Sequence, residues 1–118
     1  MSFVIKHEQF EGPLDLLLTL IEKRKLFVND ISLSKVTDDY VAYLQQNSFT
    51  MSDAASFILI ASTLLLIKSK SLLPALTLTE DEEKDVSDLQ TRLTLYEIYR
   101  RASNKIRTMF GKTILFSR

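Results

Sequence analysis

Residues 51–73, MSDAASFILIASTLLLIKSKSLL, are the stretch that decides the fold. They predict one long helix with apolar side chains around most of its circumference; Ser52 or Asp53 can cap its start, and Pro74 discourages continuation past Leu73. Such a helix must be surrounded, either by its own domain or by another chain. Its longest uncharged run, residues 54–67, is shorter than the roughly 18–20 apolar residues of a bilayer span, so we expect a buried helix and no membrane contact.

Two shorter amphipathic helices are predicted before this segment. Pro13 favours the first position of a helix over residues 13–25. A second helix is expected to be capped by Asp30 or Ser32 and to end near Gln46. The side chains expected to pack internally recur at helical spacing: Leu14, Leu17, Leu18, Ile21, Val36, Tyr40 and Leu44. Residues 26–28 and Ile31 are apolar loop residues that we expect to lie over this helix pair.

A fourth helix is predicted after an acidic segment. Residues 77–86 carry five acidic side chains and one lysine, which is typical of a solvated linker. Ser87 and Gln90 match a capping box, and Gly111 is a plausible left-handed stop. We therefore expect an all-α chain: a domain of three helices, the third long, over residues 1–76, an acidic linker over 77–86 and a helical extension over 87–118.

Composition limits the class of protein. With 118 residues, 46% of them hydrophobic and 25% charged, the chain has the balance of one ordinary soluble domain. Only two glycines and two prolines argue against an all-β fold. The lack of cysteine removes disulfides and thiolate chemistry and fits a reducing compartment, so we expect a cytoplasmic location. A formal net charge of +0 provides no long-range attraction to nucleic acid or anionic lipid.

Catalytic chemistry is not indicated. His7 has Glu8 and Glu11 nearby, but no nucleophile or oxyanion donor accompanies it, and a surface histidine is the favoured interpretation. The acidic residues 80–83 lack the glycine-turned loop of a calcium site. The sequence contains no phosphate-binding glycine loop and no zinc-ligand spacing. We therefore predict no catalytic, cofactor-binding or metal-binding residues, and a protein that is not an enzyme.

Three motifs resemble one known family. They are FEGPLDLLL at residues 10–18, Asp30-Ile31 followed by VTDDY at residues 36–40, and ASTLLLIKSKSLLP at residues 61–74. In these motifs the chain is similar to the N-terminal part of segregation and condensation protein A (ScpA), the bacterial kleisin family, over about residues 3–74, with looser agreement over 89–118. The resemblance implies a non-enzymatic, nucleoid-associated subunit that acts in chromosome condensation and segregation during cell division.

The resemblance also implies partners. Kleisins of this family bridge the heads of an Smc dimer, and their N-terminal domain packs on the coiled-coil neck of one head. Their middle region binds the dimer of segregation and condensation protein B (ScpB), so any contact with DNA would be indirect, through the complex. The family also has a C-terminal winged-helix domain that this chain does not contain, which leads us to expect an N-terminal fragment or an unusually short version.

Helical spacing selects two sets of candidate partner-binding residues. The set expected to face the Smc neck shares one side of the long helix: Met51, Ala54, Phe57, Ile58, Ala61, Leu65 and Lys68. A possible second interface on the fourth helix faces the third helix, another copy or ScpB: Leu95, Tyr99, Ala102 and Ile106. Two alternatives remain open. One is a self-associating helical module. The other is a small DNA-binding helical domain with basic residues at 23–25, 68 and 70 and at the end of the fourth helix (Arg100, Arg101, Lys105 and Arg107).

Overall fold

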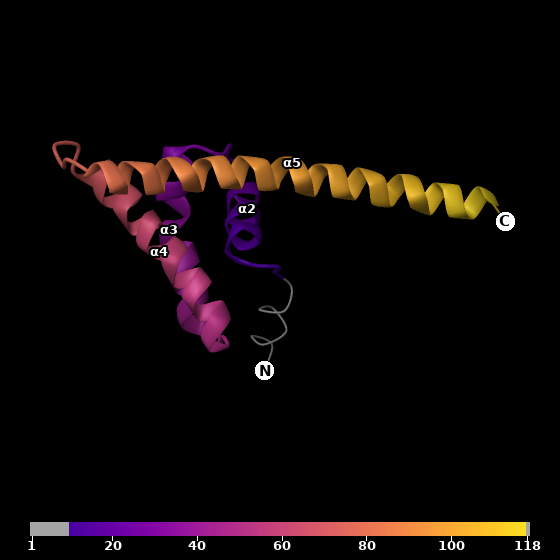
Figure 1. Cartoon of the computed structure of the whole chain (residues 1–118), viewed down its shortest axis with the longest axis horizontal. Coiled ribbons are helices and arrows are strands. Elements are labelled where there is room, and N and C mark those ends of the chain that lie inside the picture. The colour runs from indigo at the N-terminus through magenta and orange to yellow at the C-terminus, as the bar shows by residue number, and fades with distance from the viewer. Residues whose placement is uncertain (1–9, 118) are drawn as a thin grey trace.

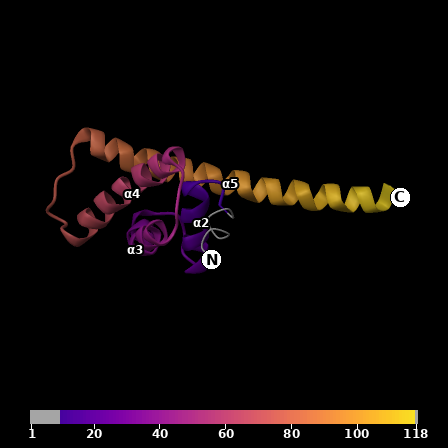
Figure 2. The same cartoon turned by 90° about the horizontal axis from the view of Figure 1, so that it is seen from below.

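The computed structural model describes the main chain of residues 10–117, which form four helices and no strand. These are α2 (Pro13–Lys23), α3 (Asp30–Gln46), α4 (Met51–Leu72) and α5 (Glu80–Ser117). Helices α2, α3 and α4 gather along the first half of α5, which then projects alone toward the C-terminal end (Figures 1 and 2). The all-α prediction is confirmed. Residues 1–9, which include His7, lie outside the described residues.

The projecting helix makes the molecule elongated. Its principal extents are 63 × 32 × 25 Å, and its radius of gyration is 16.8 Å. A compact domain of this length would have a radius of gyration of about 13.5 Å. The three-helix unit is therefore compact only together with the first half of α5.

The caps of α3 and α4 differ from the predicted ones. The Asn29 side chain accepts a hydrogen bond of 2.9 Å from the Ser32 amide, and the Thr50 hydroxyl accepts one of 3.2 Å from the Asp53 amide. The predicted caps, Asp30 or Ser32 and Ser52 or Asp53, were therefore wrong by one to three positions. Asp30 and Asp53 instead lie in the first helical turns, where a carboxylate interacts favourably with the helix dipole.

Helix α2 starts as predicted and ends earlier than expected. Pro13 is its first residue, and the helix stops at Lys23 instead of Lys25. The Lys25 amide donates to the Glu22 carbonyl at 2.9 Å, and the Leu26 amide donates to the Ile21 carbonyl at 3.1 Å. This pair of bonds is a Schellman motif, with Lys25 in the left-handed region at φ 58°. No glycine marks this position in the sequence, so the termination was not recognisable.

Helix α5 corrects the predicted acidic linker. The helix begins at Glu80, so residues 80–86 are helical, and Ser87 does not start it. Thr79 and Glu82 form the actual capping box. The Thr79 amide donates to the Glu82 carboxylate at 2.8 Å, and the Glu82 amide donates to the Thr79 hydroxyl at 3.1 Å. The acidic residues occupy the first turn, where the helix dipole favours them. Gly111 lies inside the helix, so the predicted stop there is also wrong.

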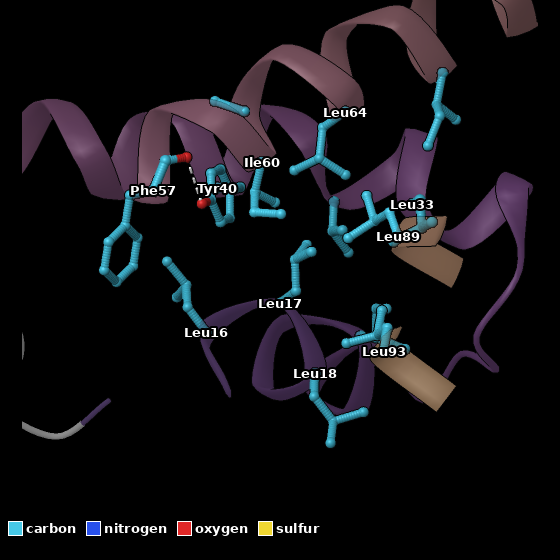
Figure 3. Close-up of a cluster of buried hydrophobic side chains, with 14 residues drawn as sticks. Leu16, Leu17, Leu18, Leu33, Tyr40, Phe57, Ile60, Leu64, Leu89 and Leu93 are labelled. Atoms are coloured by element: carbon cyan, nitrogen blue, oxygen red, sulfur yellow. Dashed lines mark hydrogen bonds between the residues drawn. The ribbon is translucent and has the colours of Figure 1, made fainter. Parts of the chain in front are cut away.

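One hydrophobic core joins all four helices (Figure 3). Of the side chains predicted to pack internally, five are buried, and Leu14 and Leu44 are half-buried against the core. Helix α5 contributes Leu89 and Leu93, which places its first half in the same core as α2–α4. The expectation for the α2–α3 loop holds only in part, because Phe27 is 84% exposed and Ile31 is 67% exposed. The core residues are Leu16, Leu17, Leu18, Ile21, Leu33, Val36, Tyr40, Phe57, Ile60, Ala61, Leu64, Ile67, Leu89 and Leu93.

Candidate helix-docking faces

Helix α4 has one face in the core and the opposite face open to solvent. Besides Leu59, which is 66% exposed, four large apolar residues on its exposed side are spaced seven residues apart: Met51, Ile58, Leu65 and Leu72. They are 91%, 57%, 49% and 68% exposed, respectively. A seven-residue repeat of apolar side chains is the pattern with which one helix packs along another in a coiled coil. These four residues are named the α4 row below.

Small side chains flank the α4 row on both sides. Ala54 and Ala61 follow the row residues by three positions, while Ala55, Ser62 and Ser69 follow them by four. Small residues beside a row of large ones let a second helix approach closely and receive the large side chains between its own. At 1.5 Å per residue the row is about 32 Å long. The face is therefore long enough to accept several turns of a docked helix.

The structure divides the predicted neck-facing set. Met51, Ile58 and Leu65 lie on the α4 row, and Ala54 is half-buried beside it. Phe57 and Ala61, in contrast, are only 3% and 9% exposed and belong to the core of this chain. Placing these two on an open face was wrong, because a helix that is apolar on all sides does not reveal which side turns inward. The sequence analysis missed Leu72, although the seven-residue repeat indicates it.

Lys68, the last member of that set, lies at the border between α4 and α3. Its ammonium group pairs with the Asp38 carboxylate at 2.6 Å. Arg24 similarly pairs with Asp39 at 2.7 Å, so both contacts tie neighbouring helices together at the surface. Lys70 donates to the main-chain carbonyls of Pro74 and Leu76. Three of the basic residues considered for DNA contact are thus engaged within the chain.

The second predicted set lies along the outer side of α5. Leu95, Tyr99 and Ile106 are 59%, 57% and 54% exposed, and Ala102 is exposed between them. Their spacing of four, three and four residues aligns them in one stripe, named the α5 seam below. Because these side chains are open to solvent, the seam does not pack against α4 of the same chain. Another chain remains as its possible cover.

A polar clamp fixes the direction of α5. The Arg100 guanidinium bonds to the Asp15 carboxylate at 2.5 Å and to the Glu22 carboxylate at 2.6 Å, both on α2. One turn earlier, the Tyr96 hydroxyl donates to the Glu11 carboxylate at 2.8 Å. Burial, the bond to Glu11 and the negative charge of Asp15 raise the pKa of the Tyr96 hydroxyl. The clamp therefore holds α5 across α2 where the helix leaves the core.

An open groove of about 790 Å³ lies between the α2–α3 loop and α5. One wall is the loop segment 28–31, and the other is the α5 segment 90–95. Leu95 of the α5 seam is one of the residues that line it, so the groove borders the seam. Among residues 10–110, no three histidine or acidic side chains gather where they could hold a metal ion.

Helix α4 also satisfies the length and composition of a membrane span, with 22 residues and a mean hydropathy of 1.6 in its most apolar window. The same criteria are met by core helices of soluble proteins. Five α4 side chains pack in the core with α2, α3 and α5, and the helix carries Lys68 and Lys70 near its end. We therefore interpret α4 as a core helix that retains one uncovered apolar face.

The described residues thus define an all-α module with two exposed apolar helix faces. The chain belongs to the family of segregation and condensation protein ScpA, which it matches over residues 20–114. It is 37% identical to segregation and condensation protein A of Brevibacillus brevis, over 100% of this chain and 51% of that protein. It is 39% identical to the same protein of Ligilactobacillus salivarius, over 96% of this chain and 45% of that protein. The resemblance to this family is therefore confirmed, and the chain spans about half the length of these relatives.

Proposed function

We propose that this chain is a non-enzymatic kleisin subunit of the bacterial condensin-like Smc complex, acting in chromosome condensation and segregation during cell division. Membership of the ScpA family supports the process, because the relatives are named for it. The α4 row is the observation that carries the mode of action. The proposed location is the cytoplasm, on the nucleoid.

The amount of exposed surface supports a protein that is covered by others. The accessible surface is 8502 Å². A compact monomer of 13.6 kDa would expose about 6,600 Å². The projecting part of α5 and the exposed side of α4 both carry exposed large apolar residues. Burying a large apolar side chain contributes about 1.5–3 kcal/mol, so covering the α4 row would drive a stable association.

The partner proposed for the α4 row is the coiled-coil neck of Smc. A coiled coil presents grooves between helices whose side chains repeat every seven residues, and the α4 row has the same repeat. Docking would add α4 to the neck as a further helix of a bundle, with Ile58 and Leu65 at the centre of the contact. Lys68 would lie at the rim of the contact, where it already pairs with Asp38.

We propose the α5 seam as the contact for the ScpB dimer. The seam runs along α5 toward its projecting part and the row lies on α4, so the two partners would occupy different helices of the same chain (Figure 1). Any contact with DNA would be made by the assembled complex. The balanced net charge and the engagement of Arg24, Lys68 and Lys70 within the chain support an indirect contact.

Titration of the 118-residue chain with a purified Smc head that includes its neck tests the main proposal. Ile58→Asp and Leu65→Asp should each weaken binding at least about tenfold, because each puts a carboxylate into an apolar contact. Ser52→Asp, exposed on another side of α4, is the matched control and should bind as the original chain does. Phe57→Asp is unsuitable, because that side chain is in the core.

Circular dichroism should show unchanged helix content in all three variants. Unchanged affinity of both row variants, at native helix content, would refute the α4 row as the Smc-binding surface. The ScpB contact is tested separately with the ScpB dimer. Ile106→Asp should weaken that binding, and Asn104→Asp, exposed on the other side of α5, should not.

A further inference from the structure

We propose that, when no partner covers the α5 seam, two copies of this chain pair through it as an antiparallel two-helix contact. The symmetry axis passes between residues 100 and 101. The contact is isologous, so each copy gives and receives the same surface and the assembly stops at a dimer. This inference does not depend on Smc binding, which uses α4. It does predict that the second copy and ScpB compete for the same residues.

The seam residues fit one another across such an axis. Leu95 of one copy meets Ile106 of the other, and Tyr99 meets Ala102. Each large ring thus faces a small methyl group, and two aliphatic side chains fill the outer layers. In antiparallel coiled coils, layers of this mixed kind pack evenly. All four residues are exposed in the single chain, so pairing needs no rearrangement of the core.

A parallel pair would fit worse. It would stack Tyr99 on Tyr99 and Ala102 on Ala102, which makes alternate layers too thick and too thin. It would also align the first turns of the two α5 helices, where residues 80–88 hold six acidic residues and one lysine. Like charges side by side repel, whereas the antiparallel arrangement puts these acidic turns at opposite ends. The helix dipoles also oppose each other favourably in the antiparallel pair.

The groove beside the seam gives the second copy an electrostatic counterpart. In the proposed register, residues 105–110 of one copy run along residues 91–96 of the other, next to the groove. Residues 105–110 contain Lys105 and Arg107 and no acidic residue. Residues 91–96 contain one basic residue, Arg92, while Asp30 lies in the groove wall and Asp88 lies three residues before this segment. The two carboxylates outnumber Arg92, so the charges beside the groove favour the basic end of a second copy.

The exposed side chains of the seam provide apolar surface for such a dimer. Leu95, Tyr99 and Ile106 are each more than half exposed. A stable protein–protein interface of standard size takes about 800 Å² from each partner, so the contact would also extend over residues beside the seam.

Single cysteines give the sharpest test, because the chain has no cysteine of its own. Leu95→Cys and Ile106→Cys are made separately and mixed in equal amounts under mild oxidation. The antiparallel register predicts a disulfide between the two different variants. Each variant alone should remain uncrosslinked, because equivalent positions then lie 11 residues, or about 16 Å, apart along the helix.

Sedimentation velocity over a concentration series measures the equilibrium. The original chain should show a monomer–dimer equilibrium, and Ala102→Glu should raise its dissociation constant about tenfold or more. Asn104→Glu adds the same charge on the opposite side of α5 and should leave the constant unchanged. Addition of the ScpB dimer should convert the homodimer of the original chain into a complex of ScpB with a single copy of this chain.

Several results would overturn the proposal. These are a monomer at every concentration together with no mixed disulfide, a dimer that persists in Ala102→Glu, and disulfides within each single variant, which indicate a parallel pair. None of them would affect binding of the Smc neck through the α4 row, so failure of this inference is distinguishable from failure of the proposed function.

Discussion

The hydroxyl of Tyr40 donates a hydrogen bond of 2.7 Å to the main-chain carbonyl of Phe57, deep between α3 and α4. The two rings also stack, with centroids 6.4 Å apart. The bond gives the buried hydroxyl a partner and fixes the register of the two helices that make the most extensive contact in the core. Neighbouring Tyr43 differs, because its buried hydroxyl has no hydrogen-bond partner within the described residues.

This difference predicts opposite results for two identical substitutions. Tyr40→Phe removes a buried hydrogen bond and should lower the free energy of unfolding by about 1 kcal/mol. Tyr43→Phe removes an unpartnered hydroxyl and should be neutral or slightly stabilising. Urea unfolding followed by circular dichroism at 222 nm measures both. Equal losses in the two variants would mean that the bond to Phe57 adds nothing to stability.

Alkaline pH should destabilise the folded chain through Tyr40. Burial raises the pKa of Tyr40 well above its usual value, whereas the unfolded chain ionises this tyrosine near pH 10. Above about pH 10 the unfolded state therefore holds fewer protons than the folded state, and stability falls as pH rises. Below that pH this group makes no contribution to the pH dependence. Urea titrations between pH 8 and pH 11 should show a shallower decline for Tyr40→Phe, and identical slopes would contradict the assignment.

The start of α5 can be tested with a second matched pair. Thr79→Ala removes the cap of the helix and should cost about 1 kcal/mol, with faster amide exchange over residues 80–86. Ser87→Ala changes an exposed residue inside the helix, where alanine is the better helix former, and should gain a few tenths of a kcal/mol. If Ser87→Ala is the costly change, the helix begins near Ser87 in solution.

The end of α2 offers a stabilising substitution. Lys25 adopts a left-handed conformation at φ 58°, which glycine tolerates without steric cost. Lys25→Gly should raise the free energy of unfolding by about 0.5–1 kcal/mol, after the greater freedom of glycine in the unfolded chain is allowed for. Lys23→Gly, two residues earlier and at the last helical position, should lower it by up to about 1 kcal/mol, the cost of glycine in a helix interior. A melting temperature that falls in both variants would show that Lys25 is not strained.

The sequence predicts what depends on local pattern and misses what depends on three-dimensional placement. Pro13 locates the start of α2, and the stripes with Leu17 and Tyr40 identify core faces, because amphipathic periodicity records which side is inward. Helix α4 carries no such record, so Phe57 was placed on the open face although it lies in the core. The run of acidic residues from Glu80 onward suggested a solvated linker. The capping box that starts the helix there involves only Thr79 and Glu82, so it is a weaker pattern in the sequence.

The candidate sites divide in the same way. The α5 seam follows from its spacing, and the structure leaves it exposed as an outer stripe. The α4 row could be recognised only once the structure showed which neighbouring residues of α4 are buried in the core. The clamp of Arg100 with Asp15 and Glu22 joins residues far apart in the chain, and no local sequence pattern predicts such a contact.

That clamp makes the last part of α5 a rigid projection from the helix bundle. From Arg100 to Ser117 the helix extends about 25 Å beyond its anchor, so a tilt of 10° at the anchor would swing the tip by about 4 Å. The carboxylates of Asp15 and Glu22 on α2 therefore set the direction of the distant end of α5. Substituting either one would change that direction without altering any residue of the projecting segment.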